Sequence, residues 1–361
     1  MIGVSDYPFA VDPTSWLVAE GLGISSLSSA AKSASDVAAW LLTEYHNPDA
    51  PLASLRVLLS PSKTERINKA IKPLLDPATS RADSASVVAE IRAFQKACKE
   101  DPGGMVFVYI AGHGVQTTNR AAVVLLSDIG DPNLPNRLSG SLDVAGFHQA
   151  MNSPGNPGKQ VWFSDACRQE PAVMSAFVSL PGAICPDIPQ GHVDTSPLVL
   201  SASTGEQAYA RPRGTLFSEA LLAGLRGSSL RGPDATSKHW YVSLFDLISW
   251  IDARVKKDSR SSNADQRIDP TGRVLDMVVQ RFEKPPDVQV TLRMVPATHS
   301  PAPKVTIDAN ATVIARFSSW PVKGVIPAGR YRITVKANPT IVNDVEIKPP
   351  KFGLSLTVVK P

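Results

Sequence analysis

Two short apolar runs constrain the fold of this chain more than any other feature of its sequence. Residues Met105–Ile110 read Met-Val-Phe-Val-Tyr-Ile, and Val161–Phe163 read Val-Trp-Phe. Neither run alternates with polar residues, which is typical of strands buried on both faces of a parallel sheet. The first run continues into Ala-Gly-His113 and the second into Ser-Asp-Ala-Cys167. Because ligands bind beyond the carboxyl ends of parallel strands, we expect His113 and Cys167 to reach one crevice.

A histidine and a cysteine in one crevice form a candidate catalytic dyad. A thiol becomes a good nucleophile when a neighbouring base takes its proton, and imidazole is such a base near neutral pH. The alternative is structural: His113 would be a histidine satisfied at a strand end, and Cys167 a small buried apolar residue, as most free cysteines are. Both residues would then stand at strand ends by accident, so the pattern favours the dyad.

These two strand ends resemble the caspase and metacaspase superfamily of cysteine peptidases. The resemblance is carried by His113-Gly114 and by the run Asp-Ala-Cys167-Arg, with 54 residues from the histidine to the cysteine, close to the caspase spacing. The caspase pattern Gln-Ala-Cys-Arg-Gly is broken twice, where Asp165 replaces Gln and Gln169 replaces Gly. An aspartate two residues before the nucleophile is typical of metacaspases.

The resemblance covers roughly residues 1–280 and implies an α/β/α sandwich around a mostly parallel sheet. It also implies a cysteine endopeptidase acting on proteins, with bacterial relatives that function in defence or regulated cell death. Cys167 would be the nucleophile and His113 the general base and acid, while the backbone N–H groups of Gly114 and Cys167 would hold the oxyanion.

Two other classes of protein remain open. One is a catalytically inactive caspase-fold protein that serves as an interaction scaffold. The other is an unrelated doubly wound binding protein of flavodoxin type, which is disfavoured because no glycine-rich phosphate loop follows the first predicted strand.

Charge predicts the substrate specificity. Asp165 and Asp36 would line a pocket for an Arg or Lys side chain, since a buried cation needs carboxylate partners. Structural roles compete with this prediction: Asp36 or Ser35 could cap a helix predicted within 27–45, and Asp165 could accept hydrogen bonds from backbone amides. Tyr209 is assigned to substrate binding because its segment, 205–217, is similar to the small-subunit region of bacterial caspase-like proteins.

No cofactor or metal ion is expected. Metacaspases often bind calcium through clustered acids near the loop at 127–140, and a pair of adjacent aspartates would be typical there. This chain offers only Asp128, Asp131 and Asp143 in that region. We therefore do not expect its activity to depend on calcium.

Composition argues against several other classes of partner. No apolar run approaches the roughly 18 residues that span a bilayer, and a net charge of +4 is too small to imply a nucleic-acid partner. Residues Met1–Tyr7 show no basic region followed by an apolar core, so no secretory signal is predicted. Three scattered cysteines fit a reducing compartment. We expect a cytoplasmic protein whose partners are protein or peptide substrates and an activating protein.

The hydrophobic period changes after Lys284-Pro-Pro286. Apolar residues alternate with polar ones from Val288 to Met294, which is the pattern of a half-buried strand. Three later segments repeat it, and Pro327-Ala-Gly329 is a turn signal between strands. We expect a peptidase domain over residues 1–283 followed by a small all-β sandwich domain over 284–361, in which no residue cluster looks catalytic.

Overall fold

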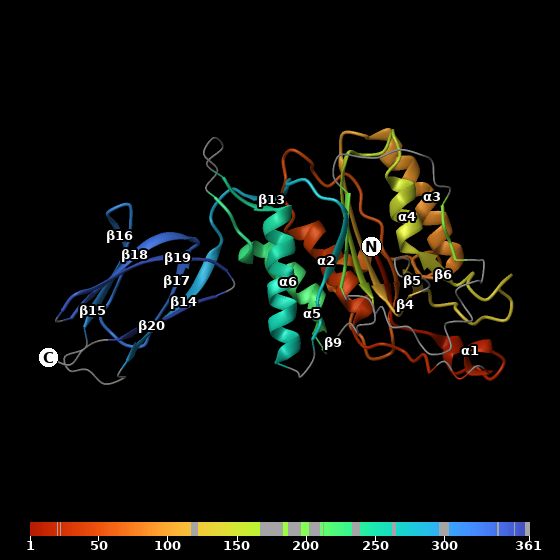
Figure 1. Ribbon diagram of the computed structural model, residues 1–361, viewed down its shortest axis with the longest axis horizontal. Coiled ribbons are helices and arrows are strands. Elements are labelled where there is room, and N and C mark those ends of the chain that lie inside the picture. Colours follow the sequence, from red (N-terminus) through yellow and green to blue (C-terminus); the bar gives the residue numbers. More distant parts are fainter. Residues whose placement is uncertain are drawn as a thin grey trace. The chain divides into compact units, whose positions relative to one another are not determined.

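The structure, a computed structural model, describes residues 1–19, 21, 23–116, 122–166, 183–186, 196–201, 210–211, 213–232, 239–261, 265–295, 303–337, 339–349 and 351–357. The chain divides into two compact units (Figure 1). The first unit contains Met1–Leu222 and Ile248–Met277, and the second contains Ala223–Leu247 and Val278–Pro361. The domain boundary expected between residues 283 and 284 stays a prediction.

A six-stranded sheet forms the centre of the first unit, in the order β12-β8-β7-β3-β1-β2. All neighbouring strands are parallel except β12, which pairs antiparallel with β8. The predicted mostly parallel sheet is therefore confirmed. Its strands are β1 (Ile2–Val4), β2 (Leu58–Ser60), β3 (Met105–Gly112), β7 (Lys159–Ala166), β8 (Ser196–Leu200) and β12 (Asp269–Arg273).

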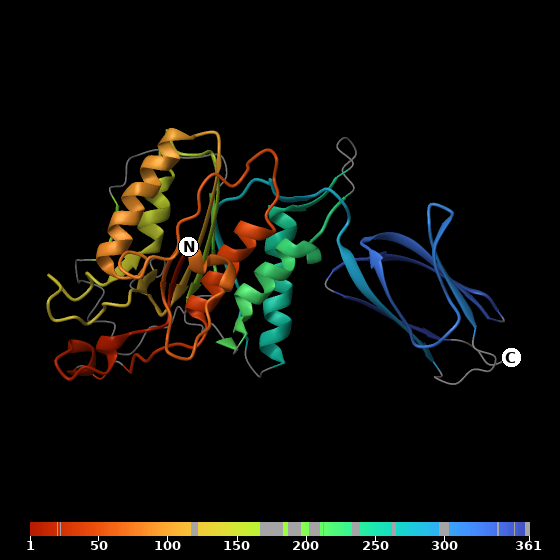
Figure 2. The same cartoon turned by 180° about the vertical axis from the view of Figure 1, so that it is seen from behind.

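Helices cover both faces of this sheet. Figures 1 and 2 show α3 and α4 on one face, and α2 with α5 and the first-unit part of α6 on the other. The predicted α/β/α sandwich is confirmed. The helices are α1 (Trp16–Ala19), α2 (Ala30–Thr43), α3 (Ser84–Glu100), α4 (Val144–Met151), α5 (Leu216–Ala223) and α6 (Leu244–Arg260), with short 3-10 helices at Pro8–Ala10 and Lys69–Leu74 and a π-helical turn at Gly224–Ser228.

The two-sided cover explains why β7 is apolar at successive positions. Successive side chains of a strand point to opposite faces. Trp162 packs edge-on against Phe147 of α4, with ring centroids 4.8 Å apart. Its neighbour Phe163 faces the other helix layer and packs against Phe217 of α5 at 5.9 Å. Both rings are buried, so each face of the strand contributes to a hydrophobic core.

Helix α2 packs unusually close to β1 and begins earlier than expected. A Cβ atom at Gly3 would lie 2.7 Å from Ala34 Cβ, so this packing requires glycine. The N-cap is Ser29, and the prediction that Ser35 or Asp36 caps the helix is wrong. Alanine and lysine at the start of the helix have high helix propensity, so the helix extends upstream and leaves both residues in its interior.

Two small antiparallel sheets accompany the central sheet in the first unit. One follows β3 directly, in the order β4-β5-β6, and the other joins β9 to β10. The strands are β4 (Gly114–Gln116), β5 (Ala122–Leu125), β6 (Ser141–Asp143), β9 (Ala210–Arg211) and β10 (Gly214–Thr215). No helix in the described part of the chain is long and apolar enough to cross a membrane.

The second unit contains the predicted C-terminal β-sandwich. A three-stranded sheet, β17-β14-β20, and a four-stranded sheet, β16-β15-β18-β19, share one hydrophobic core. Residues on β14 alternate between buried and exposed, which confirms the period-two prediction, although β14 and β20 run parallel. The strands are β14 (Asp287–Val295), β15 (Lys304–Ala309), β16 (Thr312–Phe317), β17 (Val322–Pro327), β18 (Gly329–Lys336), β19 (Ile341–Ile347) and β20 (Lys351–Thr357).

The same unit also includes a strand pair outside the sandwich and some exposed apolar side chains. Strands β11 (Trp240–Ser243) and β13 (Val278–Phe282) pair antiparallel.

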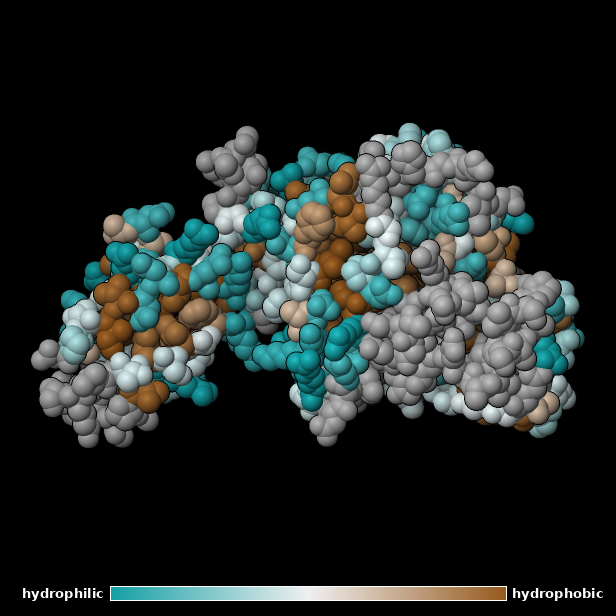
Figure 3. Space-filling view, viewed as in Figure 1, coloured by the Kyte–Doolittle hydropathy of each residue, from teal (hydrophilic) through white to brown (hydrophobic). Residues whose placement is uncertain are grey.

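Two valine side chains of this unit are largely exposed: Val325 is 63% exposed and Val342 is 53% exposed. Figure 3 shows apolar surface on this unit.

Candidate active site

Strands β3 and β7 end side by side. The last residue of β3, Gly112, pairs with the last residue of β7, Ala166, and neighbouring strands lie about 4.8 Å apart. His113 follows β3 directly, at the carboxyl edge of the sheet where the sequence predicted it. Cys167 follows β7 in the sequence and lies outside the described residues, as does Tyr209.

The imidazole of His113 is held by a backbone carbonyl. Its Nε2 lies 2.7 Å from the carbonyl oxygen of Ser25. A carbonyl can only accept, so Nε2 carries the proton and Nδ1 presents its lone pair. Burial lowers the pKa of His113, partly opposed by the hydrogen bond to Ser25. The ring is therefore neutral at physiological pH and can accept a proton at Nδ1.

Tyr7 fixes the backbone of the same residue. The His113 N–H donates to the Tyr7 hydroxyl oxygen at 2.8 Å, and the two rings lie 5.0 Å apart. The Tyr7 hydroxyl also lies 3.3 Å from the Val4 carbonyl, so it ties the ends of β1 and β3 together. A Cβ atom at Gly112 would stand 3.0 Å from this hydroxyl, which explains why glycine suits the position.

The Gly114 N–H is not used in the ladder between β4 and β5. Gly114 lies opposite Val124 in the β4–β5 ladder. The Leu125 N–H donates to the His113 carbonyl at 2.8 Å, so Gly114 and Val124 form a pair without mutual hydrogen bonds. The Gly114 N–H therefore points away from β5, on the outer side of this small sheet.

Asp165 is buried among hydroxyl groups. It is 2% exposed, and its Oδ2 accepts hydrogen bonds from the hydroxyls of Tyr109 and Thr215. Its Oδ1 is buried and has no hydrogen-bond partner among the described residues. Desolvation raises the pKa of Asp165 to about 6, although the hydroxyl groups of Thr215, Tyr109 and Ser201 oppose that shift.

A second layer of hydroxyls orients these donors. The Thr215 N–H donates to Ser33 Oγ of α2 at 3.1 Å, and the Ser218 hydroxyl donates to the same oxygen at 2.9 Å. The Ser218 N–H in turn donates to Thr215 Oγ1 at 3.0 Å. Residues from α2, β3, β7, β10 and α5 thus build one buried cluster around a single carboxylate.

Asp36 does not belong to this cluster. Its carboxylate forms an ion pair with Lys32 on the preceding turn of α2 and accepts from the Asn68 side-chain amide at 3.0 Å. Its side chain is 23% exposed. The structure brings Ser33, one turn earlier, to the Asp165 cluster instead, and a substrate contact by Asp36 stays a prediction.

Comparison with known proteins identifies the family. The model of the caspase domain matches residues 75–273, more than half of the chain. The chain belongs to the caspase domain family. This confirms the predicted superfamily, whose members are cysteine peptidases that act on proteins. Among solved structures, caspase-1 from Spodoptera frugiperda is similar, with 16% identity and a TM-score of 0.34 over 52% of this chain and 68% of that chain. No curated protein matches.

The three acids that the sequence offers at and after the loop 127–140 each accept a hydrogen bond from another residue of this caspase domain. Asp128 accepts the backbone N–H of Ser84 at 3.0 Å, Asp143 caps α4, and Asp131 accepts the Asn133 N–H at 2.8 Å. The described residues contain no group of three or more acids, histidines or cysteines that could hold a metal ion.

Sequence analysis missed four residues that contact His113 or Asp165 in the candidate site. Ser25 contributes a backbone carbonyl, which no residue pattern can reveal. Tyr7, Tyr109 and Thr215 contribute hydroxyls from separate elements. For Tyr7 a signal exists, because an aromatic residue shortly after the first strand must lie near the same sheet edge as His113.

Proposed function

We propose that the chain is a cysteine endopeptidase that uses His113 and Cys167 as its catalytic dyad and cleaves proteins after Arg or Lys. One observation carries the proposal: the His113 imidazole, held by the Ser25 carbonyl, follows the strand beside β7. In the sequence, the next residue after β7 is a cysteine.

The fixed tautomer assigns the roles of the two ring nitrogens. Nδ1 of His113 takes the proton from the Cys167 thiol, and the sulfur attacks the scissile carbonyl carbon. As the ring becomes positively charged, the Ser25 carbonyl stabilises it by accepting from Nε2. The same Nδ1 proton then passes to the leaving amine, and water hydrolyses the thioester to release the acid and restore the thiol.

The oxyanion is held by backbone donors in this proposal. The outward Gly114 N–H follows the histidine directly, and the Cys167 N–H is its expected partner. Backbone donors are already oriented before the reaction, so they stabilise the developing charge without reorganisation.

The buried carboxylate supports the preference for basic residues. With a pKa of about 6, Asp165 is ionised at neutral pH, and Oδ1 has no partner within the described residues. A buried charge without a counter-charge is unfavourable. A guanidinium or ammonium group from the substrate would supply the missing counter-charge.

Fluorogenic peptides with Arg, Lys or Asp before the cleaved bond test the proposal. Wild-type protein should hydrolyse the Arg and Lys peptides, whereas Cys167→Ala and His113→Ala should lose activity while remaining folded. Cys185→Ala and His46→Ala are matched controls, because both residues are exposed. Normal turnover by either folded dyad variant would refute the dyad, and a folded wild type that cleaves no protein or peptide would favour the scaffold alternative.

An activating protein partner, a cytoplasmic location and a role in bacterial defence or regulated cell death stay predictions from the sequence and its resemblance.

A further inference from the structure

Strand β3 is paired on one side only along its first half. On the β7 side, all its residues from Met105 to Gly112 have partners. On the β1 side, only Ile110 and Ala111 are paired. The edge from Met105 to Val108 therefore faces no neighbouring strand in the described part of the chain, although it lies in the interior of the sheet order.

A cavity of about 390 Å³ lies along this edge. It is lined on one side by Met105–Val108 and on the other by Leu52–Arg56, the segment that leads into β2. We call this cavity the strand slot. Because it borders the amino end of β3, it is separate from the crevice at His113, which follows the carboxyl end.

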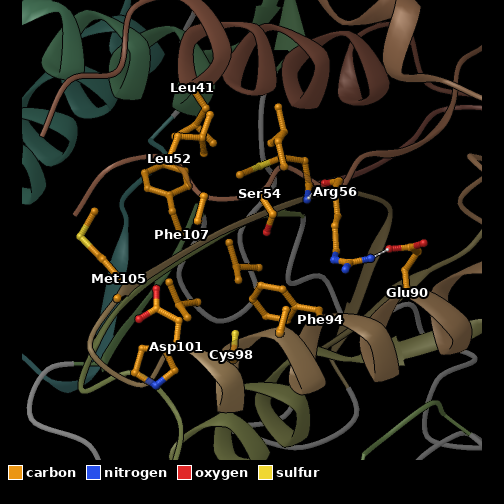
Figure 4. A pocket seen from close by; sticks show the side chains of 18 of the residues that line it. Leu41, Leu52, Ser54, Arg56, Glu90, Phe94, Cys98, Asp101, Met105 and Phe107 are labelled. Carbon is orange, nitrogen blue, oxygen red and sulfur yellow. Dashed lines mark hydrogen bonds and ion pairs between the residues drawn. The ribbon is translucent and has the colours of Figure 1, made fainter. Parts of the chain in front are cut away.

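Both faces of the strand slot are apolar. Leu41 of α2 lines it from one helix layer, and Ile91 and Phe94 of α3 line it from the other. Figure 4 shows Leu41, Leu52 and Phe107 gathered on one side of the pocket and Phe94 on the other. An occupant continuing the sheet here would be covered on both faces, so it needs apolar residues at successive positions.

The two ends of the strand slot differ in their polar groups. Asp101 stands near Met105 at one end, and Arg56 stands at the other (Figure 4). Arg56 Nη1 pairs with Glu90 of α3 at 2.8 Å. Its Nε is buried and has no hydrogen-bond partner within the described ranges. An additional carboxylate beside Arg56 would satisfy this donor.

The sheet geometry sets the direction of an added strand. Strands β1, β2, β3 and β7 are all parallel. An added strand with the same direction would begin near Asp101 and end near Arg56, so its amino end would meet an acid and its carboxyl end a guanidinium. The unpartnered Nε donor of Arg56 and the strand direction therefore select the same orientation.

We propose that the strand slot binds the C-terminal tail of a partner protein, in extended conformation, as a parallel strand between the first half of β3 and residues 52–56. The tail would contribute apolar residues and a free terminal carboxylate at Arg56, a combination of strand addition and carboxylate capture. At about 3.3 Å per residue, the edge from Met105 to Val108 accommodates about four residues. The proposal does not depend on the peptidase activity.

Binding of a synthetic peptide to the full chain tests the proposal by calorimetry. The probe is an extended peptide ending in about four alternating valines and isoleucines with a free carboxylate, preceded by lysines for solubility. Two analogues share its side chains: one has a C-terminal amide, and one has N-methylated backbone amides. The free acid should bind about tenfold more tightly than the amide, and the N-methylated peptide should not bind, because strand addition uses backbone N–H groups.

Hydrogen exchange and variants locate the bound peptide. Amide exchange should slow at residues 105–108 when the free-acid peptide binds. Arg56→Gln should remove the preference for the acid over the amide. Leu52→Asp should abolish binding, whereas Leu74→Asp, at an exposed leucine outside the slot, should not.

Three results would overturn the proposal. Equal binding of the N-methylated peptide would mean that the cavity takes apolar groups without forming a strand. Protection confined to other segments would place the peptide elsewhere. Absence of binding by the free-acid peptide to folded wild-type protein would exclude the tail as occupant.

Discussion

The Nε2 atom of His113 lies 2.7 Å from the carbonyl oxygen of Ser25, a residue 88 positions earlier in the chain. This contact determines the tautomer of the imidazole, because the carbonyl accepts only from a protonated nitrogen. The orientation of the proposed general base thus depends on the segment between β1 and α2. A change in that segment would alter catalysis without touching the dyad itself.

Tyr7→Phe should weaken both catalysis and stability. Phenylalanine preserves the packing but leaves the His113 N–H without its acceptor, and a buried donor left unpaired costs about 1–3 kcal/mol in the free energy of unfolding. We expect kcat to fall about tenfold with little change in KM, measured with an Arg peptide. Tyr331→Phe is the control, because the Tyr331 hydroxyl donates to the Pro327 carbonyl oxygen at 2.7 Å within the second unit. Equal effects of both changes on kcat would contradict a positioning role for Tyr7.

Asp165→Asn should reduce cleavage after Arg and Lys while preserving the fold. The amide oxygen can still accept from Tyr109 and Thr215, but the charge is lost. A charge-assisted hydrogen bond contributes about 1.5–3 kcal/mol, so kcat/KM for Arg peptides should fall about tenfold or more. Asp143→Asn, at the α4 cap, is the control. A wild-type enzyme that cleaves after Asp and ignores Arg would show that the pocket assignment is wrong.

The ionisation of Asp165 should contribute to the pH dependence of kcat/KM. Burial raises the pKa of this carboxyl to about 6, so below that pH it is neutral and cannot attract a cation. Activity on Arg peptides should therefore rise as pH increases through about 6. In Asp165→Asn the rise in kcat/KM near pH 6 should disappear. The pH dependence that remains should come from His113, whose pKa is lowered by burial. An unchanged profile in the variant would contradict the ionisation of Asp165 as its origin.

Protein stability should decline in acid through His148. This buried ring lies 2.7 Å from Ser196 Oγ, and desolvation lowers its pKa below the ordinary value of 6.5, opposed by the hydrogen bond to Ser196. The folded state therefore binds a proton less readily than the unfolded state. The stability contribution is present above pH 6.5 and is lost as pH falls through the folded pKa.

Denaturant unfolding across this pH range measures the effect. His148→Gln should flatten the acid decline in the free energy of unfolding, whereas His46→Gln, at an exposed histidine, should not. Identical slopes for wild type and His148→Gln would assign the decline to other groups.

The active enzyme should not cut itself in the linker after Cys167. No Lys or Arg occurs between Arg168 and Arg211, whereas Asp187 and Asp194 do, so an enzyme specific for basic residues finds no site of its own there. Mass spectrometry of active protein should show an intact linker. A cut after either aspartate that is absent in Cys167→Ala would overturn both this prediction and the basic pocket.

Sequence alone determined the strands that carry the candidate dyad. Continuous apolar runs at Met105–Ile110 and Val161–Phe163 can only be accommodated where helices cover both faces, so they identified two central strands. The end of the first run placed His113 at the ligand-binding edge. The period-two pattern after Lys284 likewise identified the β-sandwich. These signals are local: each depends on the order of residues within one element.

Tertiary structure alone decided which side chains meet. Ser25 and Tyr7 reach His113, and Thr215 reaches Asp165, across long sequence separations that no local pattern encodes. The contact of Asp36 with Asn68 was likewise not encoded in any local pattern. Hydrogen-bonding partners depend on how the chain closes in space, since burial forces each polar group to find whichever donor or acceptor the packed elements bring within reach.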